Sequence, residues 1–221
     1  MQSMKWPLLI LASCGLTSIA IAQPPSSGTA EASDTAAPAC ELHIWPSAGL
    51  ESVTEGWLLN QTRNQALRGK AGDATELAEA LEPRAQLDAI GTLDLPGAFH
   101  LGRARLIVHK DPLPAGPAGT SKIRQAASTN PCYVEFIIRR LVYARNGFAG
   151  GALQGFFTIR AFDAQGALSR SFTSMADAPL AIFPWKAPQD AESGRNELRN
   201  ALRTDILTFA SYAQKAPPKR Q

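Results

Sequence analysis

The clearest hydrophobic pattern in the chain lies between Cys132 and Phe172 and predicts three consecutive β-strands. Apolar and polar positions alternate there with a period of two, which is typical of strands that bury one face. In the run from Tyr133 to Tyr143, one parity carries the apolar residues Val134, Phe136, Ile138 and Val142, and the other carries Glu135 and Arg139. This run is therefore expected to be the longest strand of a sheet.

The next two runs predict that the chain folds back twice on this strand. Phe156 to Phe162 places Phe157, Ile159 and Ala161 on one face. Asp163 to Gly166 has turn chemistry, because Asp can bond its own backbone and Gly can take positive φ, so Ala167 to Phe172 is expected to return as a third strand. The pattern predicts an antiparallel meander at the centre of the sheet.

Two shorter alternating runs predict further strands. In Glu41 to Trp45 the side chains of Leu42 and Ile44 lie opposite the other three, and Pro46 ends the run. The segment from Arg103 to Lys110 alternates in the same way. With these runs added to the meander, the sheet is expected to be mixed.

Helical signals lie before and after the meander. The capping box of Ser52 and Glu55 predicts a helix that reaches about Arg68, and similar chemistry predicts short helices from Asp73 and from Pro83. From Asp190 to Ala213 apolar residues recur at helical spacing: Leu198, Leu202, Ile206, Phe209 and Ala213. The elements together predict an α+β single domain in which a mixed sheet with an antiparallel meander is packed by an N-terminal and a C-terminal helix.

The amino terminus has the features of a secretory signal peptide, which would occupy residues 1–22. Lys5 is followed by the apolar run Leu8 to Ile21, and Ala20-Ile21-Ala22 forms a small-x-small cleavage site. Residues 23–39 are rich in Pro, Ser, Ala and Thr and are expected to be a flexible leader to one domain over residues 40–213. Residues 214–221 are expected to be a disordered tail.

An alternative processing site overlaps this segment. Leu11-Ala12-Ser13-Cys14 resembles the lipobox of bacterial lipoproteins, so lipidation of Cys14 would anchor the protein to a membrane. The apolar run continues beyond the cysteine to Ile21, which favours cleavage after Ala22 and release into the periplasm or outside the cell.

Chain length and net charge limit the number of domains and the kinds of partner that the protein can have. A chain of 221 residues with 45% hydrophobic and 19% charged residues can bury one sizeable core. Its formal net charge of +3 is small, which argues against a nucleic-acid partner, since such proteins carry a clustered basic face. The expected partner is another protein, and the sequence does not define an oligomeric state.

Two cysteines remain after the amino-terminal segment, and each directly precedes a predicted strand. If these strands are parallel neighbours, Cys40 and Cys132 lie at the same end of the sheet. Exported proteins meet an oxidising compartment, so a disulfide between them is expected. The alternative is a pair of unpaired buried thiols.

No motif for a metal, a cofactor or a known catalytic mechanism is present. His43, His100 and His109 lack metal-binding spacing, and the chain has no G-x-S-x-G, P-loop or H-E-x-x-H sequence. A hydrolase with an active site of unrecognised pattern, using His100 or His109, stays an alternative because a triad is recognised by geometry.

Two surfaces are candidates for contact with a partner. The glycine-rich link from Asn146 to Gly155 carries Phe148 and Leu153, which would form an apolar contact point if exposed; the alternative is a plain hairpin tip. The second surface is a stripe of arginines along the meander, which is either a solvated face paired with acids or a docking site for an anionic partner: Arg139, Arg140, Arg145, Arg160 and Arg170.

The order of elements resembles that of small α/β domains in bacterial envelope accessory proteins. The comparison covers Cys40 to Ala213 and includes a short strand, a helix, a second strand, the meander and a closing helix. The relevant classes are the auxiliary lipoproteins of envelope transport systems and the amino-terminal domain of the Tol-Pal propeller protein. The resemblance implies an exported binding or scaffolding protein of the periplasm or envelope; the alternatives are a hydrolase and a binder of small apolar or lipid ligands between helix and sheet.

Overall fold

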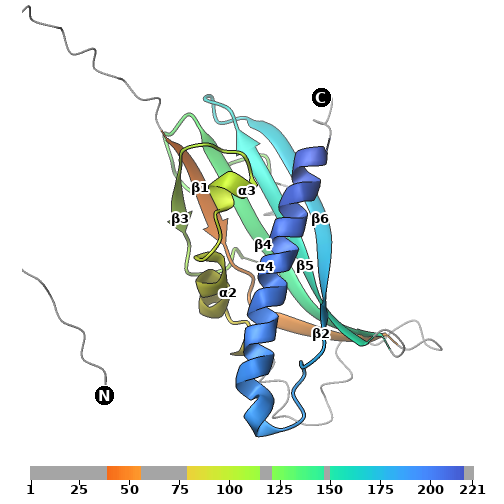
Figure 1. Cartoon of the computed structure of the whole chain (residues 1–221). Coiled ribbons are helices and arrows are strands. Elements are labelled where there is room, and N and C mark those ends of the chain that lie inside the picture. Colours follow the sequence, from red (N-terminus) through yellow and green to blue (C-terminus); the bar gives the residue numbers. More distant parts are fainter. Residues whose placement is uncertain (1–38, 56–78, 115–120, 147–149, 217–221) are drawn as a thin grey trace, which may run out of the picture. The chain divides into compact units, whose positions relative to one another are not determined.

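A computed structural model describes residues 39–55, 79–114, 121–146 and 150–216, all within the unit Ala36–Gln221. These residues form an α+β domain in which helices lie on one face of a mixed, six-stranded sheet (Figure 1). The predicted fold class is confirmed. Within the described ranges, no helix combines the length and the apolar character needed to cross a membrane.

The elements follow one another in an order close to the predicted one. Along the chain they are β1 (Cys40–Trp45), β2 (Leu50–Glu55), α2 (Pro83–Ile90), α3 (Leu95–Ala98), β3 (Ala104–Val108), β4 (Tyr133–Asn146), β5 (Gly150–Phe162), β6 (Leu168–Leu180), a 3₁₀ turn (Pro188–Asp190) and α4 (Ala191–Lys215).

The sheet has the strand order β3-β1-β4-β5-β6, and β2 pairs with β4 beyond the end of β1. β1 lies parallel to both β3 and β4, whereas β4, β5 and β6 form the predicted antiparallel meander. β6 is longer than expected and reaches Leu180, through Pro179. Among the described strands β6 pairs only with β5, and an edge strand tolerates proline because its outward backbone positions need no ladder donor.

A β-bulge in β4 changes which side chains reach the core. The pairing with β5 shifts between Ile138 and Arg140, so Arg139 is an extra residue. Before the bulge, Val134, Phe136 and Ile138 join the core as predicted; after it, Leu141 and Tyr143 do so. The expectation that Val142 shares a face with Val134 is wrong, because one inserted residue reverses the parity of all that follow.

The predicted helix from Ser52 to about Arg68 is also wrong at its start. Leu50–Glu55 is strand β2, whose residues pair in parallel register with Leu141–Asn146. The added sheet ladder outweighs the local capping signal, as tertiary context often does with helix propensity. Residues 56–68 and the predicted helix start at Asp73 lie outside the described residues. The predicted helix from Pro83 is present as α2.

The core lies between the sheet and the helices, with α4 across β5 and β6 (Figure 1). The apolar positions predicted for α4 are all buried, and Phe209 is central among them. Its ring centroid lies 5.3 Å from that of Phe157, 5.9 Å from Phe136 and 5.5 Å from Phe172. The C-terminal helix is thus fixed to the meander by an aromatic cluster.

The connection from β6 to α4 is held by one carboxylate. Glu197 accepts hydrogen bonds from the backbone amides of Ala181, Ile182 and Phe183 at 2.6–3.1 Å. The bond between Phe183 and Pro184 is cis. Phe183 is buried and Trp185 packs against the core, whereas Ile182 is 44% exposed.

Candidate functional site

Polar side chains gather on the sheet face opposite α4, along β1 and just after the end of β3. His43 Nε2 lies 3.3 Å from Glu41 Oε2, and His43 Nδ1 lies 3.0 Å from His109 Nε2. A carboxylate only accepts, so His43 donates through Nε2; with a neutral His43 ring, Nδ1 then accepts from the Nε2–H of His109. We call Glu41, His43 and His109, together with Ser128, the histidine cluster.

Glu41 is the most strongly held member of this cluster. Ser128 Oγ donates to its Oε2 at 2.5 Å, and Arg105 Nη2 donates to its Oε1 at 2.5 Å. The hydroxyl of Ser128, followed by Arg105 and His43, lowers the pKa of Glu41 to about 2 against the opposing effect of burial. Glu41 is therefore ionised over the whole physiological range.

Aromatic rings pack against the cluster, in which Glu41 and His43 are buried. His109 stacks on Trp45 with centroids 4.0 Å apart and planes at 3°, and His43 lies 4.5 Å from Tyr133. Burial, and then the neighbouring His43, lower the pKa of His109. The lowered pKa favours the neutral imidazole of His109 at pH 7.

The connectivity of the cluster does not match a nucleophile–base pair. A catalytic serine donates to a histidine, which an acid orients. In this protein Ser128 donates directly to Glu41, and both nitrogens of His43 are taken by Glu41 and His109. The contacts connect β1, β3 and the segment 121–131, which is a structural task.

A second buried group fastens segment 121–131 to the same face. Arg160 Nη2 donates to Glu135 Oε2, and both side chains are fully buried. Glu135 Oε1 also accepts from the backbone amide of Gln125 at 2.6 Å and from the hydroxyl of Tyr133 at 2.9 Å. Burial, and then the Glu135 charge, raise the pKa of Tyr133, so its hydroxyl keeps its proton and donates.

Two of the residues predicted to contact a partner are buried instead. Arg160 pairs directly across the strands with Glu135, but both are buried, whereas the acid-paired alternative for the stripe expected a solvated face. Leu153 is fully buried because its side chain points to the core side of β5. Arg139 is exposed at the bulge. Phe148 lies outside the described residues.

The predicted disulfide is present. Cys40 and Cys132 are bonded, with their Cα atoms 4.6 Å apart, at the start of the parallel neighbours β1 and β4. Cys14 lies outside the described residues, so its lipidation stays a prediction.

The described ranges contain no group of three or more His, Cys, Asp or Glu side chains that could hold a metal ion. His100, the other histidine considered for a hydrolase, lies apart from the cluster. It is exposed after α3, in the left-handed region at φ 54°.

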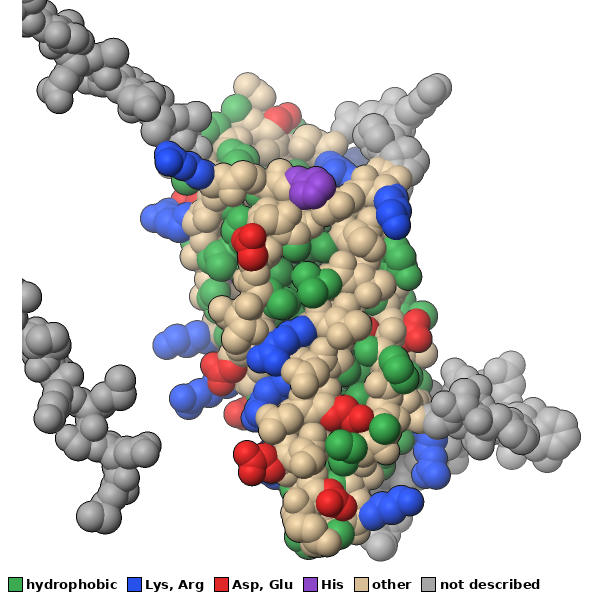
Figure 2. Space-filling view, viewed as in Figure 1, with side chains coloured by type: hydrophobic (Ala, Val, Ile, Leu, Met, Phe, Trp, Pro, Cys, Tyr) green, Lys and Arg blue, Asp and Glu red, His purple; other side chains and the backbone are tan. Residues whose placement is uncertain are grey.

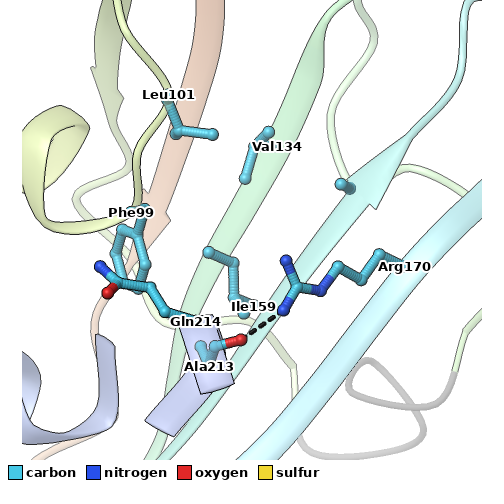
Figure 3. Close-up of a pocket in the computed structure, with 8 residues that line it drawn as sticks. Phe99, Leu101, Val134, Ile159, Arg170, Ala213 and Gln214 are labelled. Atoms are coloured by element: carbon cyan, nitrogen blue, oxygen red, sulfur yellow. Dashed lines mark hydrogen bonds between the residues drawn. The ribbon is translucent and has the colours of Figure 1, made fainter. Parts of the chain in front are cut away.

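An apolar pocket lies on the helix face, between α3, the end of α4 and the sheet (Figure 3). Its free volume is about 70 Å³. Most of its wall is apolar, and Arg170 and Gln214 supply the polar groups: Phe99, Leu101, Val134, Ile159, Ala161, Arg170, Ala213 and Gln214. It is smaller than the few hundred Å³ of ordinary ligand sites, so it fits the end of an apolar chain.

Arg170 links this pocket to the end of α4. Its Nη2 donates to the carbonyl oxygen of Ala213, drawn in Figure 3, and lies 3.4 Å from that of Ala216. The last carbonyls of a helix lack intrahelical partners and favour a cation. The sequence pattern indicates a stripe that includes Arg170 but not the pocket, because the walls of the pocket come from five distant segments.

No family model matches the chain, and neither does any curated protein. Three solved structures resemble its fold. A Xanthomonas campestris protein of the DUF330 family has a TM-score of 0.39 and 11% identity, over 79% of this chain and 82% of that one. A hypothetical protein of Chlamydia trachomatis has a TM-score of 0.33 and 10% identity, over 80% of this chain and 99% of that one. A minor lipoprotein of Acinetobacter baumannii has a TM-score of 0.34 and 11% identity, over 82% of this chain and 96% of that one. At these TM-scores the likenesses support no conclusion about family or activity.

Proposed function

We propose that this chain is an exported, non-catalytic accessory protein of the bacterial cell envelope that binds another envelope protein. The observation that carries the proposal is the pattern of hydrogen bonds within the histidine cluster. Its serine, acid and histidine satisfy one another in an order that ties strands together and leaves no serine bonded to a histidine.

Two further features support export. The Cys40–Cys132 bond is of the kind that persists in oxidising compartments. The amino-terminal sequence has the charge, apolar run and cleavage site of a signal peptide, with Gln23 as the first mature residue or, in the alternative, a lipidated Cys14.

Crosslinking in cells of the native host tests this function. The tagged full chain is expected to capture an envelope protein, whereas a variant that lacks residues 2–22 should stay in the cytoplasm and capture none. Mass spectrometry of the mature amino terminus distinguishes Gln23 from a diacylglyceryl-modified Cys14. Capture of cytoplasmic proteins alone, or a hydrolase activity that disappears in His109→Ala, would contradict the proposal.

The pocket of Figure 3 favours a second candidate, a binder of small apolar or lipid ligands. Solvent extraction of the purified protein is then expected to release a copurified lipid. Ala161→Phe would fill the pocket and abolish the copurification, while Ala164→Phe, at an exposed turn position, would leave it unchanged. Equal lipid in both variants would exclude this site.

A further inference from the structure

The outer edge of β3 is open within the described part of the chain. β3 pairs with β1 alone, and it forms the margin of the sheet (Figure 1). An edge of this kind presents a row of backbone donors and acceptors that can pair with another strand.

The hydrogen bonds at the two ends of β3 show which backbone groups point outward. Arg103 O accepts from Cys40 N at 3.0 Å, and His109 N donates to Ile44 O at 2.9 Å. In a parallel strand, the N–H and C=O groups of alternate residues point to opposite sides. Arg105 and Ile107 therefore bond to β1, and the outward groups belong to Ala104, Leu106 and Val108.

The helix-side face of this edge is apolar and incompletely covered. Leu106 pairs across from Leu42, and Val108 from Ile44, so their side chains share the face that forms the core. Leu42 and Ile44 are fully buried, but Leu106 is 40% and Val108 49% exposed. The apolar layer therefore continues to the edge strand β3, where the described residues cover it only in part.

The opposite face of the edge is basic. Arg103 and Arg105, whose positions alternate with those of Leu106 and Val108, are exposed, and the only acid bonded to them in the described ranges is Glu41, which holds Arg105. Figure 2 shows hydrophobic and basic side chains on the side where Figure 1 places β3. A second copy of the chain would bring a second basic edge, which like-charge repulsion disfavours.

We propose that β3 is a docking edge for an extended segment of a partner protein in which apolar and acidic residues alternate. Such a segment would add a strand to the sheet, cover Leu106 and Val108 with one face, and place carboxylates opposite Arg103 and Arg105 with the other. The proposal names the kind of partner for the binding function above and rests on it. Its test uses purified protein alone, so failure of this edge leaves the crosslinking and export results unaffected.

Hydrogen exchange measured by NMR tests the edge, with the mature chain and the peptide acetyl-Val-Glu-Val-Glu-Val-Glu-amide. At a peptide concentration of ten times its Kd, exchange of the Ala104, Leu106 and Val108 amides is expected to slow about ten-fold. The Arg105 and Ile107 amides, already bonded to β1, should change little. The matched peptide with lysine in place of glutamate should give no protection.

Variants separate the two faces of the edge. Arg103→Glu is expected to weaken acidic-peptide binding at least several-fold, and Val108→Lys to abolish it. Met175→Lys is the matched control, because Met175 is 41% exposed on β6 at the other margin of the sheet; it should bind as the wild type does.

Three results would overturn the proposal. The first is no protection by either peptide, or equal protection by both. The second is slow exchange of the outward amides when the protein is monomeric and no peptide is present. This result would mean that another segment of the same chain occupies the edge. The third is their protection without peptide in a dimer by sedimentation, which would assign the edge to a second copy.

Discussion

Replacing Arg160 with methionine is expected to lower the free energy of unfolding by about 3–5 kcal/mol, the usual cost of removing one partner of a buried ion pair. Arg160 and Glu135 are both fully buried, so the variant leaves a carboxylate in the interior without its counter-charge. It also removes the hydrogen bond from Arg160 Nη1 to the Ser121 carbonyl oxygen, at 2.6 Å.

Urea denaturation followed by circular dichroism measures this loss. Adding Glu135→Gln to Arg160→Met should recover part of it, because no unpaired charge then remains buried. The control is Arg139→Met at the exposed bulge, expected within about 0.5 kcal/mol of wild type. Faster exchange of the Gln125 amide, which donates to Glu135, would show that segment 121–131 has loosened. An unchanged stability of Arg160→Met would refute the structural role assigned to the pair.

Asp205 is expected to make the protein less stable as the pH rises from about 4 to 8. It lies on α4 with 0% of its surface exposed, and within the described residues neither carboxyl oxygen has a hydrogen-bond partner of standard geometry. Burial, followed by repulsion from Asp177, raises its pKa from 3.8 to about 8, although the Gly155 amide opposes the shift.

The direction of the pH effect follows from proton binding. Above pH 4 the unfolded chain has released the proton of Asp205, while the folded protein keeps it until about pH 8. The folded state thus binds more protons in this window, so stability falls by up to about 1.4 kcal/mol per pH unit and levels off above the folded pKa. At pH 7 the accumulated cost is about 4 kcal/mol, as an upper bound.

Asp205→Asn is therefore expected to raise the free energy of unfolding at pH 7 by about 2 kcal/mol or more, since the amide carries no charge but still lacks partners. Urea titrations at pH 5, 6, 7 and 8 measure the slope, which should flatten in this variant. Asp177→Asn is the control. This exposed residue contributes only the smaller of the two effects that raise the pKa of Asp205, so most of the slope should remain. Identical slopes in wild type and Asp205→Asn would show that Asp205 ionises normally in the folded protein.

Local pattern was sufficient to predict the meander, β1, β3 and α4. These elements follow periodic burial, and residues such as Leu42 in β1 and Leu202 in α4 pack at the expected spacing; β4 departs from it only after the bulge. The Cys40–Cys132 disulfide could be predicted because parallel pairing of two predicted strands places both cysteines at the same end of the sheet.

The parts that could not be predicted depend on contacts between distant segments. β2 forms because Leu50–Glu55 pairs with β4, about ninety residues later in the chain. The capping chemistry of Ser52 is local and carries no information about that pairing. The histidine cluster requires β3 to lie beside β1, and the burial of Arg160 requires Glu135 directly across from it. Before the strand order is known, a charged residue on the polar parity of a strand looks exposed.

The extra residue at Arg139 makes the length of β4 a stronger constraint than its composition. A substitution on either side of the bulge alters one side chain, whereas gain or loss of a single residue would exchange inside for outside along the rest of the strand. Divergence in this protein is therefore expected to proceed through replacement within β4, and through insertion or deletion only at turns such as Asp163–Gly166, where no downstream register within the strand depends on the count.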